Sequence, residues 1–312
     1  MQVWRALLAM ARRGACLALI GLACSNPTTS SEARPRGAFI NVGTPAQPLR
    51  LWLEETGVGE PMLLIHGLGG NTYTWHHLAP RLANRHRVLS VDLKGFGRSD
   101  KPFDEAYALL DQVALLETLI RRKGLRNLTI VGHSFGGGVA LALTAKLNQT
   151  QPDAVARLVL IDSIAYPQPV PLFIELLRTP VLAEVGIYSA PPELEAYKGL
   201  LAAYADPQKI TFETVRAYAE PLYEPGGRHA LLKTAQEIIP RNLPALIAKY
   251  ATVQQPTLLI WCAADPVVPL SVGKRLVRAL PRARLSVLKG CGHIPQEELP
   301  VTTLALMRAF LG

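Results

Sequence analysis

Leu128-Thr-Ile-Val-Gly-His-Ser-Phe-Gly-Gly-Gly138 joins a short apolar run to a serine that has glycines on both sides. The apolar residues predict a buried strand, and residues 136–146 predict a helix. The flanking glycines permit a sharp turn in which strand and helix backbones approach closely. A strand, a sharp turn and a helix around Gly-x-Ser-x-Gly lift the serine hydroxyl above a sheet. Ser134 is therefore the candidate nucleophile.

Six further apolar runs of strand length occur along the chain, and helix-length segments separate most of them. Short buried strands that alternate with helices are typical of a mostly parallel sheet with helices on both faces. The predicted fold class is therefore α/β. The six runs span residues 51–53, 62–65, 88–93, 158–161, 257–261 and 285–288, and the helical segments span 75–83, 106–122, 136–146 and 271–280.

Residues 165–250 interrupt the alternation, because they contain helical patterns and no convincing strand. Prolines punctuate the segment and limit the length of each helix. An insertion between two sheet strands is well placed to form a lid. We predict a core from residues 47–164 and 251–312, and a helical cap from residues 165–250. The helical patterns span residues 172–177, 193–205, 211–222 and 228–239.

A serine hydroxyl is a weak nucleophile unless a base accepts its proton. The best candidate is His293, which lies in Gly290-Cys-Gly-His-Ile-Pro-Gln-Glu-Glu298 after the last predicted strand. His133 is interpreted as a packing residue beside Ser134, and His66 as a support for the glycine loop after it. His229 lies in the insertion and would at most touch a substrate.

The base needs a carboxylate that orients it and stabilises its charged form. Asp265 follows the predicted strand at 257–261, which gives the chain order Ser134, Asp265, His293. Asp162 is a rival at the end of the 158–161 strand, where its alternative role is to cap a turn. We favour Asp265.

The developing oxyanion needs two hydrogen-bond donors. The Phe135 N–H, next to the nucleophile, is expected to supply one. The Leu68 N–H in His66-Gly-Leu-Gly-Gly70 is expected to supply the other. No Lys-Ser/Thr follows this glycine loop, which excludes a Walker phosphate loop. Acyl transfer by these groups requires no metal or organic cofactor.

The motifs together resemble the α/β-hydrolase superfamily from about residue 47 to 312, and most closely its lid-bearing bacterial carboxylesterases. The resemblance implies an eight-stranded sheet with a helical cap. Ser134, Asp265 and His293 occupy the family's triad positions. The matching motifs are His66–Gly70, Asp92-Leu-Lys-Gly-Phe-Gly-Arg-Ser-Asp-Lys-Pro102, Gly132–Gly137, and Pro256–Asp265 with Gly292-His293.

The resemblance predicts a serine hydrolase that cleaves carboxylic esters of short to medium acyl chain, with a small-molecule ester as its partner. Ser134 argues against epoxide hydrolases and haloalkane dehalogenases, which carry Asp at this position. Carbon–carbon bond hydrolases often have Asn before the nucleophile and Trp after the catalytic histidine, where this chain has His133 and Ile294. Lactonase, perhydrolase and carbon–carbon hydrolase activities stay open, as does a non-catalytic ligand-binding protein.

Aromatic side chains of the insertion are expected to contribute to the substrate pocket. An apolar pocket separates substrates that differ by one methylene by only ~1–3 kcal/mol, so the pocket residues do not name a substrate. The predicted substrate-binding residues are Phe173, Tyr188, Tyr197 and Tyr218.

Cys262 stands where the family usually has Gly, and Cys291 lies two residues before His293. The resembling fold places these two strand ends side by side, and an oxidising compartment permits a disulfide there. We hypothesise a bond that joins the loop of Asp265 to the loop of His293. The alternative is a pair of small buried apolar residues.

The first 24 residues have the parts of a secretory signal. Arg5, Arg12 and Arg13 precede an uncharged apolar run at residues 14–23, which is shorter than the ~20 residues of a membrane-spanning helix. Gly21 and Ala23 precede Cys24 as in a bacterial lipoprotein signal, so Cys24 is a candidate lipidation site. Simple secretion and a retained anchor are the alternatives. Residues 25–46 are rich in Ser, Thr, Pro and Gly and are predicted to be a linker.

These features predict an exported protein, lipid-anchored in the cell envelope or else periplasmic or secreted. The 312 residues are 49% hydrophobic and 18% charged, which excludes disorder as the main state. The net charge is +9, but basic residues form scattered pairs rather than runs, so no nucleic-acid partner is predicted. The four cysteines show no zinc-finger spacing. No oligomeric state is predicted.

Overall fold

The computed structural model describes residues 36–312. The predicted signal at residues 1–24, the candidate lipidation site Cys24 and residues 25–35 lie outside the described residues. Within residues 36–312, no helix is both long enough and apolar enough to cross a membrane.

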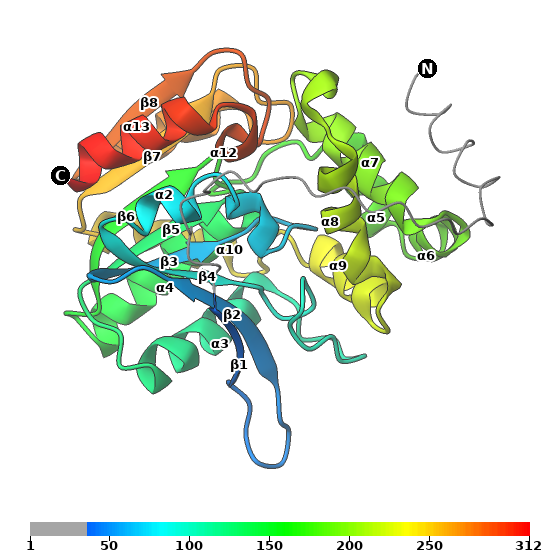
Figure 1. Cartoon of the computed structure of the whole chain (residues 1–312), viewed down its shortest axis with the longest axis horizontal. Helices are drawn as coiled ribbons and strands as arrows, with labels where there is room; N and C mark the ends of the chain where they lie inside the picture. Colours follow the sequence, from blue (N-terminus) through cyan, green and yellow to red (C-terminus); the bar gives the residue numbers. More distant parts are fainter. Residues whose placement is uncertain (1–35) are drawn as a thin grey trace, which may run out of the picture. The chain divides into compact units, whose positions relative to one another are not determined.

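One eight-stranded sheet forms the centre of the fold, in the order β1-β2-β4-β3-β5-β6-β7-β8 (Figure 1). Strand β2 pairs antiparallel with β1 and β4, and the remaining neighbours are parallel. All seven predicted strands and the predicted α/β class are confirmed. The strands are β1 (Arg36–Asn41), β2 (Arg50–Thr56), β3 (Glu60–Ile65), β4 (His86–Val91), β5 (Leu128–His133), β6 (Val155–Ile161), β7 (Thr257–Cys262) and β8 (Ala283–Leu288).

Strand β1 corrects the prediction of a linker through residue 46. Arg36–Asn41 pairs with β2 over its whole length, and the Phe39 ring packs edge-on against Trp52 at 5.1 Å between ring centroids. Composition alone did not reveal this strand, because an edge strand is stabilised largely by its pairing partner. The core therefore includes residues that the sequence assigned to a tether.

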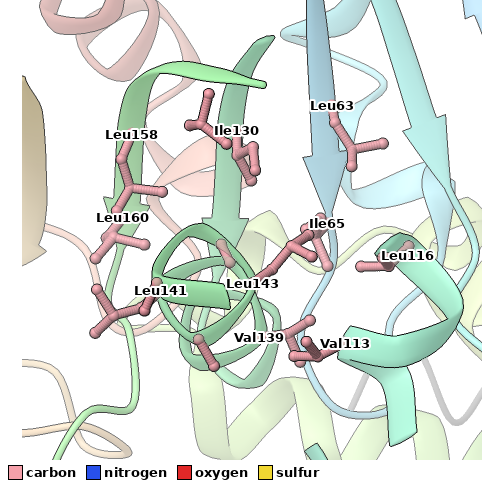
Figure 2. Packing of buried hydrophobic residues seen from close by; sticks show 14 of the residues in the cluster. Leu63, Ile65, Val113, Leu116, Ile130, Val139, Leu141, Leu143, Leu158 and Leu160 are labelled. Atoms are coloured by element: carbon pink, nitrogen blue, oxygen red, sulfur yellow. The ribbon is translucent and has the colours of Figure 1, made fainter. Parts of the chain in front are cut away.

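Alternating strand residues fill two hydrophobic layers, one on each face of the sheet. Leu63 and Ile65 pack in one layer with helices α3, α4 and α11, whereas Met62 and Leu64 pack in the other with α2 and α13. Figure 2 shows side chains of α3, α4 and the strands meeting in the first layer. These helices are α2 (Ala79–Leu82), α3 (Leu109–Arg122), α4 (Phe135–Thr150), α11 (Leu270–Ala279) and α13 (Pro300–Leu311).

The helix predicted over residues 75–83 is wrong in extent. The structure has a 3₁₀ turn, η1 (Thr72–Trp75), and then the single-turn helix α2. Pro80 lies in the first turn of α2. A proline is tolerated there because it has no backbone N–H, and residues in the first turn donate no hydrogen bond within the helix. Trp75 and Leu82 are nevertheless buried, so the apolar pattern predicted the buried residues correctly although it predicted the wrong helix.

Residues 165–250, which we call the insertion, connect β6 to β7 and are mostly helical; Figure 1 shows α5–α9 grouped together beside the sheet. The sequence patterns missed α6 and α10. Helix α6 is apolar on nearly every side, so it lacks the polar face that marks an amphipathic helix. The helices are α5 (Leu172–Arg178), α6 (Pro180–Ser189), α7 (Pro192–Ala203), α8 (Phe212–Tyr223), α9 (Gly227–Gln236) and α10 (Leu243–Ala248).

Candidate active site

Ser134 stands at the turn between β5 and α4 with φ 53° and ψ −118°. Side chains rarely adopt this conformation, and the close approach of neighbouring backbones holds it here. A Cβ atom on Gly136 would lie 2.2 Å from the His66 carbonyl oxygen. A Cβ atom on Gly132 would lie 2.4 Å from the Gly136 carbonyl oxygen. The Ser134 N–H donates to the Ile161 carbonyl at 2.9 Å, which ties the turn to β6.

His293 lies between β8 and the short helix α12 (Pro295–Glu298), and it connects the serine to a carboxylate. Its Nε2 is 2.8 Å from the Ser134 Oγ, and its Nδ1 is 2.8 Å from the Asp265 Oδ2. Because a carboxylate accepts hydrogen bonds, Nδ1 carries the proton and Nε2 is the acceptor for the serine hydroxyl. This is the arrangement that a general base requires.

The backbone of His293 is fixed on both sides. Its N–H donates to the Ala203 carbonyl at 2.6 Å, and its carbonyl accepts from the His133 Nε2 at 2.7 Å. Burial lowers the pKa of His133 well below its ordinary value, which keeps the ring neutral. His133 is therefore buried, as the packing interpretation predicts, and it also holds the loop of His293.

Asp265 follows β7, and its side chain is buried. Its Oδ1 accepts hydrogen bonds from the Val267 N–H at 2.7 Å and the Val268 N–H at 2.9 Å. The rival Asp162 makes a different contact, since its Oδ1 accepts from the Cys262 N–H at 2.9 Å. The structure therefore places Asp265, and not Asp162, at His293.

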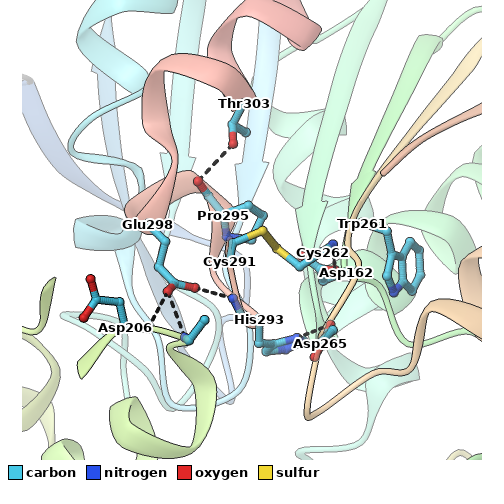
Figure 3. The surroundings of a disulfide bond; sticks show 12 residues. Asp162, Asp206, Trp261, Cys262, Asp265, Cys291, His293, Pro295, Glu298 and Thr303 are labelled. Carbon is cyan, nitrogen blue, oxygen red and sulfur yellow. Dashed lines mark hydrogen bonds and ion pairs between the residues drawn. A yellow bond between two sulfur atoms is a disulfide. The ribbon is translucent and has the colours of Figure 1, made fainter. Parts of the chain in front are cut away.

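A disulfide joins Cys262, at the end of β7, to Cys291, in the loop of His293, with 5.5 Å between the Cα atoms. The hypothesis of a bond between these two loops is confirmed (Figure 3). Both cysteines are buried in the same hydrophobic layer of the sheet. The bond therefore fixes the start of the Asp265 loop against the start of the His293 loop.

The amides of Leu68 and Phe135 are available as donors. Neither N–H donates a hydrogen bond to another group within residues 36–312. The loop that carries Leu68 is held by His66, whose Nδ1 donates to the Gly67 carbonyl at 2.8 Å while its Nε2 accepts from the Leu93 N–H at 3.0 Å. Burial lowers the pKa of His66 to about 4, so the ring is neutral and keeps both roles.

A cavity of about 660 Å³ lies over Ser134 and His293, and most of its lining comes from the insertion. Phe173 and Tyr218 line it, as predicted. Tyr188 and Tyr197 do not, which corrects that part of the prediction. Tyr188 is 55% exposed, and the Arg228 guanidinium lies 5.5 Å from the centre of its ring.

Helical periodicity explains which residues face the cavity. In α7 the lining residues recur at helical spacing, and Tyr197 lies outside this set: they are Glu195, Ala196, Lys198, Gly199, Leu200 and Ala203. In α6 the lining residues include Ala183, Gly186 and Ile187, and Tyr188 lies outside that set. The sequence reasoning chose the aromatic residues of the insertion and overlooked the small residues that leave space for a ligand.

Two adjacent glutamates of α12 link the insertion to the His293 loop, and the sequence reasoning missed both. Glu297 accepts hydrogen bonds from the hydroxyls of Thr74, Tyr204 and Tyr218 at 2.5–2.8 Å. Burial raises the pKa of Glu297. Glu298 accepts from the Gly292 N–H at 2.6 Å and the Ala205 N–H at 2.8 Å. These bonds hold the C-terminal end of α7 against the histidine loop.

The charges around the cavity are few. Among the described residues that line it, Lys198 is the single Lys or Arg, and its Nζ lies 3.2 Å from the Glu195 Oε1. His229 does not line the cavity, and its Nε2 instead contacts the Asp104 carbonyl at 2.8 Å. Within residues 36–312, no group of three or more His, Cys, Asp or Glu side chains is arranged to hold a metal ion.

Residues 60–300 match a family model described as the alpha/beta hydrolase fold. A 2-hydroxymuconate semialdehyde hydrolase of Pseudomonas sp. CF600 is 29% identical over 278 residues, which cover 86% of this chain and 92% of that protein. Lipase 3 of Moraxella sp. TA144 is 30% identical over 261 residues, which cover 81% of this chain and 77% of the lipase. An alpha/beta hydrolase fold protein from Burkholderia ambifaria has a solved structure that superposes with a TM-score of 0.73 at 26% identity, covering 83% of this chain and 93% of that one.

Proposed function

Because the chain belongs to the α/β-hydrolase fold family, we propose that it is a serine hydrolase that cleaves carboxylic esters through an acyl-serine intermediate. The observation that carries this proposal is the continuous contact from Ser134 Oγ through His293 to Asp265, with 2.8 Å at each step, beneath a mostly apolar cavity. Each step below uses groups of this chain, the substrate and water.

In the first half-reaction, the Ser134 Oγ attacks the ester carbonyl carbon while the His293 Nε2 accepts the hydroxyl proton. Asp265 stabilises the imidazolium that forms and keeps the ring in position. The carbonyl oxygen becomes an oxyanion between the N–H groups of Leu68 and Phe135. The tetrahedral intermediate then collapses, His293 protonates the departing alcohol, and Ser134 keeps the acyl group.

In the second half-reaction, a water molecule attacks the acyl carbon and gives its proton to the His293 Nε2. Collapse of the second tetrahedral intermediate breaks the bond to Oγ, and His293 returns its proton to Ser134. The carboxylic acid leaves, and the site is restored. Loss of one oxyanion donor typically costs ~10²–10³ in rate, so the two amides carry a substantial share of the catalysis.

The cavity supports an uncharged, apolar substrate. Its one Lys or Arg, Lys198, is already paired with Glu195, which leaves little attraction for an anionic ligand. A water molecule occupies ~30 Å³ of liquid volume. A methylene group is similar in size to a water molecule. The cavity of about 660 Å³ therefore has room for roughly twenty methylene groups. We therefore propose esters of medium acyl chain as better substrates than acetyl esters.

Hydrolysis of a carbon–carbon bond is the second candidate. The similarity to the hydrolase of Pseudomonas sp. CF600 favours it, because the match covers nearly all of that protein. His133 and Ile294, in place of Asn and Trp, argue against it. Lactone and perhydrolysis chemistry would use the same three residues.

Turnover of p-nitrophenyl acetate, butyrate, octanoate and palmitate tests the proposal. We expect fastest turnover at octanoate, and Ser134→Ala should lose at least ~10⁴-fold in kcat because the nucleophile is gone. Circular dichroism of the variant controls for folding. Turnover of 2-hydroxymuconate semialdehyde but of none of the four esters would establish the second candidate instead.

We also propose that the protein is exported and that the insertion acts as a lid. A disulfide between Cys262 and Cys291 supports export, because such bonds persist in oxidising compartments. Lipidation of Cys24 is tested by labelling cells with radioactive palmitate. We expect label in the natural chain and none in Cys24→Ser; equal label in both would contradict the assignment.

A further inference from the structure

Two buried carboxyl groups lie side by side where β6 and β7 end. Asp162 follows β6, and its N–H donates to the Ile260 carbonyl of β7 at 3.0 Å. Its side chain is fully buried, and the Asp265 carboxylate lies close enough to raise its pKa. Figure 3 shows Asp162 beside Cys262, with Asp265 and His293 in the same group of side chains. The reaction outlined above makes no use of Asp162.

The hydrogen bonds of the two groups are unequal. Asp265 accepts two backbone N–H bonds and the bond from His293, so its carboxylate is well stabilised as an anion. Asp162 accepts only the Cys262 N–H on its Oδ1. Its Oδ2 is buried and has no donor among the described residues. Asp162 therefore has a buried oxygen that lacks a donor, and the charge of Asp265 is nearby.

Two adjacent buried carboxyl groups cannot both ionise without a large cost, so one of them keeps a proton. Burial, and secondly the negative charge of Asp265, raise the pKa of Asp162 well above its ordinary range. The proton therefore remains on Asp162, where the unpartnered Oδ2 is the natural place for it. A proton at that atom turns an unfavourable contact between two acceptors into an O–H···O hydrogen bond.

We propose that Asp162 is a positioning residue that remains protonated and donates a hydrogen bond to Asp265, holding in place the carboxylate that orients His293. This proposal rests on the proposed function of Ser134, Asp265 and His293. The Asp265 loop is then fixed at three places: the Cys262 N–H on Asp162, the Cys262–Cys291 disulfide, and the Asp265 carboxylate itself.

The alternative is that Asp162 merely caps the turn after β6 by accepting the Cys262 N–H. Asp162→Asn retains both roles, because an amide still accepts on oxygen and donates on nitrogen. A double-mutant cycle with Asp265→Ala and the proton resonance of His293 distinguish positioning from capping. Asn also tolerates the left-handed backbone of this residue, which has φ 43°. Asp162→Ala removes both roles, and Asp162→Gly, which adopts this backbone conformation freely, replaces Ala if that variant does not fold.

The first experiment compares kcat and KM for p-nitrophenyl octanoate. Partners that orient a reactive side chain typically matter about 10- to 100-fold, so Asp162→Ala should lower kcat by that factor with little change in KM. Asp162→Asn should stay within about threefold of the natural protein, because it retains the donor. Equal losses in the two variants, or no loss in Asp162→Ala, would overturn the proposal.

A double-mutant cycle with Asp265→Ala tests whether Asp162 acts through Asp265. In the Asp265→Ala background, Asp162→Ala should change kcat less than about threefold, since the group that it positions is absent. A loss as large as in the natural background would mean that Asp162 supports the fold in general. A larger loss would mean that it contacts His293 itself. Either result overturns the proposal.

A measurement that does not depend on ester turnover tests the role of Asp162 independently of the proposed function. The proton between His293 Nδ1 and Asp265 is expected to give a low-field ¹H NMR resonance, which Asp162→Ala should shift and Asp162→Asn should preserve. If the natural protein shows no Ser134-dependent turnover, the proposed function fails and the resonance still decides the role of Asp162. A resonance unchanged in Asp162→Ala would overturn that role.

Discussion

At the scale of single residues, the site depends on backbone positions that admit only certain side chains. Ser134 is held at φ 53° because the start of α4 packs directly on the ends of β3 and β5. Gly136 makes this contact possible, since it lies against the carbonyls of Ile65 and His66. The glycine next to the nucleophile therefore sets the distance between the serine turn and the loop of Leu68.

Gly136→Ala should destabilise the protein by ~1–3 kcal/mol and lower activity more strongly, because the added Cβ would lie 2.2 Å from a backbone oxygen. Urea unfolding measures the first effect and ester turnover the second. Gly199→Ala is the matched control, because its Cβ meets no atom within 4 Å, and it should stabilise α7 by ~0.5–1 kcal/mol. Equal free energies of unfolding for Gly136→Ala and Gly199→Ala would contradict the claim that close backbone contact at Gly136 excludes a side chain.

His66 gives the fold a specific pH dependence. Its folded pKa of about 4 lies below the unfolded value of ~6.5, so the unfolded chain binds more protons between these values. The stability that the neutral ring contributes is present above pH ~6.5 and is lost as the pH falls toward 4, at ~1.4 kcal/mol per pH unit.

Comparison with His66→Gln isolates this effect from other titrating groups. The difference in unfolding free energy between the natural protein and the variant should shrink by ~2 kcal/mol between pH 6.5 and pH 5. Urea unfolding at both pH values measures it. A difference that stays constant over this range would show that His66 is not held neutral in the fold.

At the scale of elements, the loops after β7 and β8 behave as one unit. The disulfide closes a segment of 29 residues between them, and Glu298 connects the second loop to the insertion. The acid and the base thus come from different loops whose relative position is covalently fixed.

Cys262→Ala/Cys291→Ala should lower the free energy of unfolding by ~3–4 kcal/mol, the value expected for closing a loop of this length. It should also lower ester turnover, because the Asp265 and His293 loops are no longer joined. Unfolding with and without dithiothreitol provides the control: the reductant should destabilise the natural protein and leave the double variant unchanged. An effect of the reductant on both would point to another cause.

At the scale of the whole molecule, the sheet presents the reactive side chains and the insertion supplies most of the lining of the cavity above them. The small residues of α6 and α7 shape that space. Gly186 and Gly199 line the cavity, and a Cβ atom on either would meet nothing within 4 Å. Larger side chains there should reduce the volume for a substrate without disturbing the core.

Gly199→Leu should slow turnover of octanoate and palmitate esters at least tenfold and leave acetate turnover within about twofold, because the added side chain takes up cavity volume that a long acyl chain needs. The chain-length profile of p-nitrophenyl esters measures this. Ala202→Leu is the control on the same helix, since Ala202 does not line the cavity. A parallel fall for all chain lengths would indicate damage to the site itself.

Seven strands, the serine turn and the candidate residues Ser134, Asp265 and His293 could all be predicted from the sequence. These follow from local patterns: apolar runs, glycines that permit a tight turn, and polar residues at strand ends. The cysteines near Asp265 and His293 were likewise visible as a pair. Most of these features are encoded in short stretches, so one sequence suffices to find them. The cysteines lie 29 residues apart, and only the resemblance to a known fold pairs them.

Three features became visible in the folded protein alone: Asp265 is the carboxylate that meets His293, Arg36–Asn41 is a strand, and Tyr188 and Tyr197 do not line the cavity. The fold also places Asp162 near Asp265 and joins Glu297 to the tyrosines of the insertion. Each of these outcomes depends on contacts between segments far apart in the chain. Pairing partners, packing angles and burial set such contacts, and no local pattern records them.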